Sequence, residues 1–339
     1  MILPYFLINI IITIFFIFIF ILFAKKLKLI DIPTSRKNHI GNIPMIGGLA
    51  IYLSLLLLLL FFSFSFWINM IVLSSSIVVV LGALDDSLNL GVLIRLLSQL
   101  LAGLLMLGSG LSILDIGNYG SLAPIELGVF GILLTLISVT GLTNAINFMD
   151  GIDGLCSGLV LIAILSIYYF SYIDISNVDL NFLIFFASSI FIFFLFNLGI
   201  IPSKKVFLGD SGSMMLGFIT AWLLIYYAHP SIRSIHPVLT LWCVTIPVYD
   251  IIGVIIRRII RRINPLKPDR RHLHHILLDK GFSSYHVLII ILLLATISSF
   301  LGGMVFYIFG SSVSLFLFFI GLLIYLYFSV ILLRKVTIK

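Results

Sequence analysis

The sequence predicts an all-α, polytopic integral membrane protein with about eleven transmembrane helices, an external N-terminus and a cytoplasmic C-terminus. Hydrophobic residues make up 61% of the 339 residues and charged residues only 10%, whereas about a quarter of the residues in soluble domains are charged. The mean hydropathy is +1.27. Apolar stretches of roughly 20 residues, the length of one helical crossing, recur along the chain. These observations exclude a soluble globular protein.

The expected spans follow one another with short polar connections. They lie near residues 3–23, 46–65, 67–84, 93–112, 128–147, 155–173, 180–200, 213–228, 237–256, 285–308 and 313–333. Of the 20 Lys and Arg residues, only Arg233 then falls on the outer face. Because cytoplasmic loops carry an excess of Lys and Arg, the other face is assigned to the cytoplasm. One missed or extra span would exchange the faces of all later loops and mix these counts.

The first span is expected to be retained rather than cleaved as a signal peptide. No basic residue precedes it, Lys25, Lys26 and Lys28 follow it, and no small-residue cleavage site is present. Cys156 and Cys243 lie in apolar runs, which indicates small buried side chains rather than a disulfide or a metal site. We predict one membrane domain over residues 1–339, with cytoplasmic active-site loops near residues 24–45, 85–95, 147–155, 201–213 and 257–284.

A polar stripe interrupts the apolar pattern at the end of the fifth expected span. Asn144, Asn147, Asp150 and Asp153 recur every third residue, so on a helix all four would line one wall of a cleft. Carboxylate and amide oxygens suit a divalent cation and the phosphates that it neutralises, since Mg²⁺ is held by one or two carboxylates plus substrate phosphate. The stripe therefore predicts a phosphate-handling metal site.

Two further acidic segments lie at the same face. Asp85 and Asp86 end the third expected span, where they form either a solvated turn or paired carboxylates for a metal ion or a phosphate. Residues 209–213, Gly-Asp-Ser-Gly-Ser, begin the eighth span with Asn197 upstream. This turn is either an ordinary helix cap or a phosphate cradle in which Asp210 faces a metal.

The cationic candidates lie in the longest and the first cytoplasmic loops. Residues 268–275 contain Arg270, His272, His274 and His275, which favour a cup for a pyrophosphate; zinc is disfavoured because no thiolate accompanies them. The arginines of residues 257–262 are more typical of a lipid-facing or topological role.

Three other polar residues leave alternatives open. In the first loop, Lys37 and His39 contact an anionic lipid or nucleotide, or else anchor the loop at the interface. Asp250 lies inside a span, where pairing with Arg257 is favoured over substrate contact.

In this order the segments resemble the polyprenyl-phosphate N-acetylhexosamine-1-phosphate transferases, glycosyltransferase family 4. The resemblance covers residues 31–284 and is most specific at residues 144–154, 207–213 and 268–275. The last segment is similar to the bacterial branch that transfers N-acetylglucosamine (GlcNAc) 1-phosphate. The phospho-MurNAc-pentapeptide translocase branch has a differently composed histidine segment and ranks second. Asn89 and Arg95 depart from the family pattern, which often has Asp and Lys there.

The resemblance implies transfer of GlcNAc 1-phosphate from UDP-GlcNAc to undecaprenyl phosphate, giving undecaprenyl-pyrophosphate-GlcNAc and UMP. This reaction is the first membrane step of O-antigen, common-antigen or teichoic-acid synthesis in the bacterial inner membrane. It requires Mg²⁺, for which Mn²⁺ can substitute, at the cytoplasmic face of the bilayer. No nucleic-acid partner is implied, and a homodimer is one option for the oligomeric state. An ion-coupled transporter is the alternative from a different class, but its acids would lie near helix midpoints.

The resemblance also implies individual roles. Asp210 would be the principal metal ligand, helped by Asn147 or Asp150. Asp85 and Asp86 would lie near the acceptor phosphate, with Asp85 deprotonating or orienting it. Asp153 and Asn197 would surround the uridine, and the three histidines would bind the diphosphate or shape the nucleotide pocket.

Overall fold

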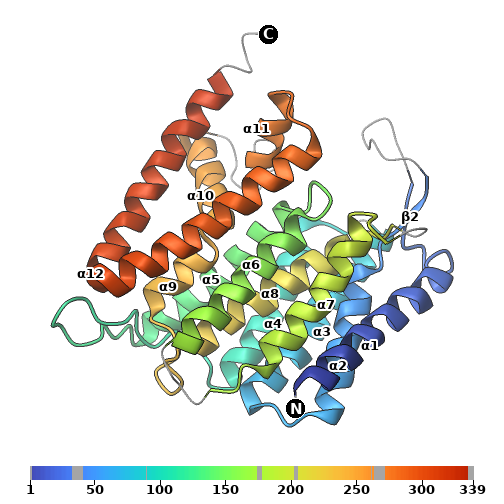
Figure 1. Ribbon diagram of the computed structural model, residues 1–339, viewed down its shortest axis with the longest axis horizontal. Coiled ribbons are helices and arrows are strands. Elements are labelled where there is room, and N and C mark those ends of the chain that lie inside the picture. The colour runs from blue at the N-terminus through green and yellow to red at the C-terminus, as the bar shows by residue number, and fades with distance from the viewer. Residues whose placement is uncertain are drawn as a thin grey trace.

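The structure is a computed structural model that describes residues 2–32, 41–88, 90–173, 178–201, 205–260, 262 and 272–334. Most of these residues are helical (Figure 1). At least six described helices are long and apolar enough to cross a membrane. They are α1 (Ile2–Phe23), α3 (Phe66–Leu88), α5 (Val129–Phe148), α6 (Leu155–Ile173), α8 (Gly209–Ala228) and α12 (Ser284–Arg334). The chain is therefore a multi-pass membrane protein, as predicted.

The remaining helices are shorter or bent. Three apolar helices have 15 to 17 residues: α2 (Gly47–Phe61), α4 (Val92–Gly108) and α7 (Asn181–Asn197). Helices α9 (Pro237–Cys243) and α10 (Thr245–Ile260) meet at an angle of 81°, and α11 (Leu273–Asp279) is a short surface helix. Helix α12 is broken at Gly310, whose φ of 83° and ψ of 177° are not helical. Figure 1 shows its two arms diverging from a sharp bend.

Helix α8 lies at the centre of the bundle. Nearly all of its side chains are buried, and α2, α3, α5 and α6 pack around it. Trp222, Phe218 and Tyr227 fill the space between these helices and are fully buried. The first residues of α8 are small because their neighbours come very close. A Cβ atom on Gly48 would lie 2.3 Å from Gly212 Cα, and one on Gly82 would lie 2.5 Å from Ser211 Cα.

A short hairpin connects the first loop to the start of α8. Strands β1 (Ile30–Asp31) and β2 (Ile43–Pro44) pair antiparallel. Directly after β2, the Gly47 amide donates to the Phe207 carbonyl (2.9 Å) and the Gly48 amide to the Leu208 carbonyl (3.1 Å). The chain entering α2 is thus fixed against the chain entering α8.

Buried polar side chains attach the first helix to the bundle. The Asn9 amide on α1 donates to the hydroxyls of Ser188 (2.7 Å) and Ser189 (2.9 Å) on α7, and Ser189 also contacts Ser54 on α2 (3.0 Å). Hydrogen bonds between spans add to packing where helices have no hydrophobic driving force to associate. Cys156 and Cys243 are buried and free, as expected.

Two local predictions were wrong. Helix α3 continues to Leu88, so Asp85 and Asp86 lie in its last turn and not in a loop beginning at residue 85. Helix α5 ends at Phe148, so Asn144 and Asn147 are helical whereas Asp150 and Asp153 lie in the following turn. The positive φ of Gly154 (76°) lies in this turn, where the chain reverses into α6. The four polar residues therefore do not form one helical wall.

Candidate active site

Three helix ends bring the predicted carboxylates together. Asp85 and Asp86 come from the last turn of α3, Asn147 from the end of α5 and Asp210 from the first turn of α8. These elements converge because α3 and α5 both pack along the buried α8. Residues 125 positions apart in the sequence are thereby placed in hydrogen-bonding contact.

Asp86 caps the start of α8. Its carboxylate accepts hydrogen bonds from the backbone amides of Asp210 (2.8 Å) and Ser211 (3.2 Å), two of the amides that a helix start leaves without intrahelical partners. Gly209 makes this approach feasible, because a Cβ atom there would lie 2.6 Å from Asp86 Oδ2 and its φ is +75°. Asp86 is therefore a positioning group for Asp210 in this structure.

Arg95 on α4 bridges the other two carboxylates. Its Nε lies 2.6 Å from Asp85 Oδ2 and its Nη1 lies 3.1 Å from Asp210 Oδ2. Asp85 is almost fully buried, and neither of its oxygens accepts a well-aligned hydrogen bond. The planar guanidinium can address two carboxylates at once, which a Lys ammonium does less well. Arg95 thus ties Asp85 to Asp210 at a position where the family pattern often has Lys.

Asn147 completes the acidic group. Its amide nitrogen donates to Asp210 Oδ1 (2.9 Å) and to the Ser213 hydroxyl (2.7 Å). Asp150 lies in the turn after α5; desolvation by the surrounding protein, followed by the charges of Asp210, Asp86 and Asp153, raises its pKa. Because the Asp150 side chain itself reaches solvent, we attribute the raised pKa chiefly to the neighbouring carboxylates.

The candidate uridine residues are fixed by local contacts. Asp153 forms an ion pair of 2.5 Å with Lys205, whose ammonium lies 5.4 Å from the centre of the Phe207 ring. Asn197 accepts a hydrogen bond from the Gly154 amide (2.6 Å) and donates to the Val206 carbonyl (2.9 Å). Asn197 thus links the turn after α5 to the segment before α8.

The Asn144 side chain makes its hydrogen bonds away from the acidic group. Its amide donates to Gln99 on α4 (2.8 Å) and to the Thr140 carbonyl (2.7 Å). Gln99 in turn contacts the Met214 sulfur (3.5 Å). Asn144 therefore serves packing between α4, α5 and α8 in this structure.

The histidine segment packs against the turn that carries Asp150. His272 is buried with its Nδ1 atom 2.6 Å from Asp250 Oδ2. His274 is fully buried, and a Cβ atom on Gly151 would lie 2.1 Å from its Nε2. Burial, followed by the nearby charges of His275 and His272, lowers the pKa of His274 to about 3. The sequence favoured a pair between Asp250 and Arg257. The hydrogen-bonding partners of Asp250 in the structure are instead His272, the Leu273 amide and Tyr325.

Lys37, His39 and Arg270 lie outside the described residues. Some contributors were not among the predicted site residues. Lys205 could have been found, because it stands five positions before Asp210 in a predicted site loop. Tyr325, which contacts Asp250 (2.7 Å), lies in an apolar run with no motif to indicate it.

The donor set fits a metal ion with few protein ligands. Among the described residues no three His, Cys, Asp or Glu side chains are grouped as a ready metal cage. Arg95 nevertheless joins Asp210 to Asp85, and Asn147 lies within hydrogen-bonding distance of Asp210. Mg²⁺ commonly takes one or two carboxylates and completes its shell with water and substrate phosphates. These residues fit such an ion and do not fit a closed structural site.

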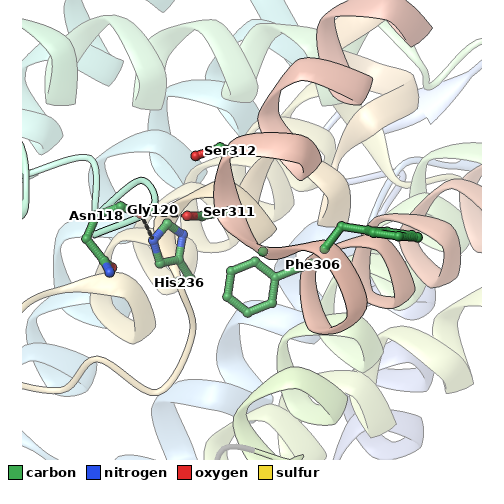
Figure 2. Close-up of a pocket in the computed structure, with 8 residues that line it drawn as sticks. Asn118, Gly120, His236, Phe306, Ser311 and Ser312 are labelled. Carbon is green, nitrogen blue, oxygen red and sulfur yellow. Dashed lines mark hydrogen bonds between the residues drawn. The ribbon is translucent and has the colours of Figure 1, made fainter. Parts of the chain in front are cut away.

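A separate cavity of about 300 Å³ lies at the opposite ends of the helices, beside the α12 bend (Figure 2). His236 and Ser311 both contact the Asn118 carbonyl there, at 3.1 and 2.7 Å. None of the predicted site residues lines it.

Comparison with known proteins agrees with this geometry. The family model described as glycosyl transferase family 4 matches residues 68–228. The undecaprenyl-phosphate alpha-N-acetylglucosaminyl 1-phosphate transferase of Escherichia coli K12 is 32% identical over 289 residues, covering 82% of this chain and 77% of the relative. The chain belongs to glycosyl transferase family 4.

Other relatives give similar matches. The enzyme of the same name from Yersinia pestis is 32% identical over 290 residues, covering 82% of this chain and 77% of the relative. A probable undecaprenyl-phosphate N-acetylglucosaminyl 1-phosphate transferase from Bacillus subtilis is 30% identical over 281 residues, covering 81% and 77%. The family-model match contains the residues of α3, α5 and α8 that form the acidic group. The predicted family membership is confirmed.

Proposed function

We propose that this chain transfers GlcNAc 1-phosphate from UDP-GlcNAc to undecaprenyl phosphate, giving undecaprenyl-pyrophosphate-GlcNAc and UMP. The carrying observation is that the carboxylates of Asp85 and Asp86 on α3 meet that of Asp210 on α8 at one end of a membrane bundle, where Arg95 bridges Asp85 and Asp210. The names of the relatives support the same reaction. A lipid phosphate and a nucleotide sugar are both anions that meet at a membrane surface, so the site requires charge neutralisation beside the bilayer.

In the proposed reaction, an oxygen of the lipid phosphate attacks the phosphorus that carries the sugar. The bond from that phosphorus to the oxygen of the UMP phosphate breaks, and UMP leaves. Such transfers depend on in-line positioning and on neutralising charge more than on a strong base. Asp85 and Arg95 would position the acceptor phosphate. Lys205 and the histidine segment would hold the donor, and Asp86 would fix the backbone of Asp210.

We assign Mg²⁺, with Mn²⁺ as a substitute, to Asp210 and Asp85, assisted by Asn147. When bound, the ion would neutralise phosphate oxygens and improve the leaving group. Displacement of Arg95 from one carboxylate would accompany binding, because its guanidinium contacts both ligands.

We also propose eleven crossings with the N-terminus outside and the C-terminus in the cytoplasm. That number counts the six long helices with α12 as two arms, the bent α9–α10 pair as one crossing, and the shorter α2, α4 and α7. The acidic group then faces the cytoplasm, on the side that collects the cationic loops. We place the protein in the bacterial inner membrane because its relatives are bacterial.

A radiolabel assay on purified protein in detergent tests the reaction. The protein is given undecaprenyl phosphate, Mg²⁺ and either UDP-GlcNAc or UDP-MurNAc-pentapeptide, and lipid-extractable label and released UMP are measured. We expect label from UDP-GlcNAc alone, abolished by EDTA. Transfer from the MurNAc donor alone would overturn the assignment of substrate. Absence of transfer from both, with folded protein, would overturn the proposed reaction.

A further inference from the structure

We infer that Asp250 is a positioning residue for the nucleotide-sugar site, acting through His272. This inference rests on the proposed function, because it assigns the histidine segment to the donor. Asp250 lies on α10, is fully buried, and is outside the acidic group described above. Burying an unpaired carboxylate costs free energy unless other groups compensate its charge. The partners of Asp250 therefore indicate its role.

The two oxygens of Asp250 have different partners. Oδ1 accepts from the Leu273 amide (2.8 Å) and from the Tyr325 hydroxyl on the second arm of α12 (2.7 Å). Oδ2 lies 2.6 Å from His272 Nδ1. The backbone position of the segment is therefore held by one oxygen, and the orientation of the His272 ring by the other.

An ionised carboxylate can only accept hydrogen bonds, so the contact with Oδ2 requires a proton on His272 Nδ1. This fixes the tautomer of the neutral ring and the direction of its Nε2 atom, as carboxylates hydrogen-bonded to the other ring nitrogen do for many functional histidines. Nε2 is then an acceptor when His272 is neutral. A ring that carries a proton on both nitrogens presents Nε2 as a charged donor, which suits a phosphate oxygen.

The histidine cluster transmits this orientation to the acidic turn. The His272 ring lies 5.0 Å from the Phe148 ring at the end of α5 and stacks parallel to the His274 ring at 6.0 Å. His274 packs on Gly151, next to Asp150. Asp250 thus determines how the histidines face the turn that follows Asn147, although no described contact joins Asp250 to the acidic residues themselves.

An Asp250→Asn variant distinguishes a positioning role of Asp250 from a purely structural one. The Asn oxygen can replace Oδ1 and keep the contacts with Leu273 and Tyr325, so the fold is retained. Its NH₂ group then faces His272 Nδ1, and two donors cannot pair. The ring must adopt the opposite tautomer, with the proton on Nε2. Tyr325→Phe is the matched control, because it removes a hydrogen bond to Asp250 and leaves the His272 contact intact.

The first measurement is the tautomer, read from the ¹⁵N shifts of histidine-labelled protein in which His272→Asn identifies the signal. We expect Nδ1–H in the unchanged protein and in Tyr325→Phe, and Nε2–H in Asp250→Asn. The same tautomer in all three proteins would overturn the inference. This readout does not depend on turnover and is decided even if UDP-GlcNAc proves not to be the donor.

The second measurement separates donor binding from the other substrate. We expect Asp250→Asn to raise the KM for UDP-GlcNAc by about 10- to 100-fold, because the His272 ring loses the charge-assisted hydrogen bond to Asp250 that orients it. The KM for undecaprenyl phosphate should stay within about twofold of the unchanged value. Equal increases in both constants, or a similar donor defect in Tyr325→Phe, would indicate a structural role and overturn the inference.

If Asp250→Asn does not fold, His272→Asn provides the test. Asn retains a donor near the Nδ1 position for Asp250 but lacks the Nε2 atom. A KM for UDP-GlcNAc that rises by about 10- to 100-fold supports the inference. An unchanged KM for UDP-GlcNAc overturns it. Absence of transfer by the unchanged protein would contradict the proposed function separately.

Discussion

Substituting Gly82 should move the acidic group without altering any polar side chain. In Gly82→Ala the added methyl would lie 2.5 Å from Ser211 Cα, whereas carbon atoms in contact prefer about 3.5–4.0 Å. The start of α8 must therefore shift from α3 by roughly 1 Å, and Asp210 shifts with it. A misplacement of about 1 Å can cost roughly 100-fold in rate, so we expect about a 100-fold loss of turnover. Overpacking should also destabilise the protein by about 1–3 kcal/mol.

Gly141→Ala is the matched control. Gly141 lies within α5, and a Cβ atom there would have no neighbour within 4 Å. Its turnover should be unchanged, and its unfolding temperature should not fall because Ala favours a helix over Gly. Turnover is measured with the radiolabel assay and folding by thermal unfolding in detergent. Folded Gly82→Ala with unchanged turnover would refute the argument that close packing of α3 and α8 sets the position of Asp210.

Three further predictions follow from the site. Asp210→Asn should lower turnover by at least about 100-fold in folded protein, since an amide is a poorer metal ligand; near-normal turnover would remove Asp210 as the principal ligand. Arg95→Gln should tighten Mn²⁺ binding by about tenfold, measured by electron paramagnetic resonance, because a cation leaves Asp85 and Asp210; weaker binding would contradict competition. Because burial lowers the pKa of His274 to about 3, below about 6.5 in the unfolded chain, its contribution to stability is present above pH 6.5 and lost toward pH 3. Unfolding free energy should therefore fall by up to about 1.4 kcal/mol per pH unit below 6, less steeply in His274→Leu, and parallel pH curves would contradict this assignment.

Local sequence patterns determined much of this protein. Hydropathy over windows of about 20 residues is set by composition alone, because a helix that enters lipid must be apolar along its length. The acids at the ends of such runs had to lie near a membrane surface. Asp85, Asp86, Asn147 and Asp210 could thus be predicted, from their places along the chain, as candidates that share one face of the membrane.

Only the tertiary structure decided which of these residues meet and how. Asp86 caps α8, Arg95 bridges two carboxylates, and Asn144 turns to Gln99 although it shares the spacing of Asn147. Because α5 ends at Phe148 and the chain reverses at Gly154, the four polar residues predicted to line one helix face do not do so. The physical reason is that side-chain partners depend on how helices are rotated and how closely they pack.

The contacts of Asp250 illustrate the same limit. The sequence offered Arg257, about two turns further along the same span, as its partner, whereas the structure supplies His272 and the distant Tyr325. Tyr325 lies in an apolar run that hydropathy describes only as a span. Periodicity records which residues enter the membrane, but long-range packing of one helix against another selects the hydrogen-bonding partners, and that information is spread over the whole chain.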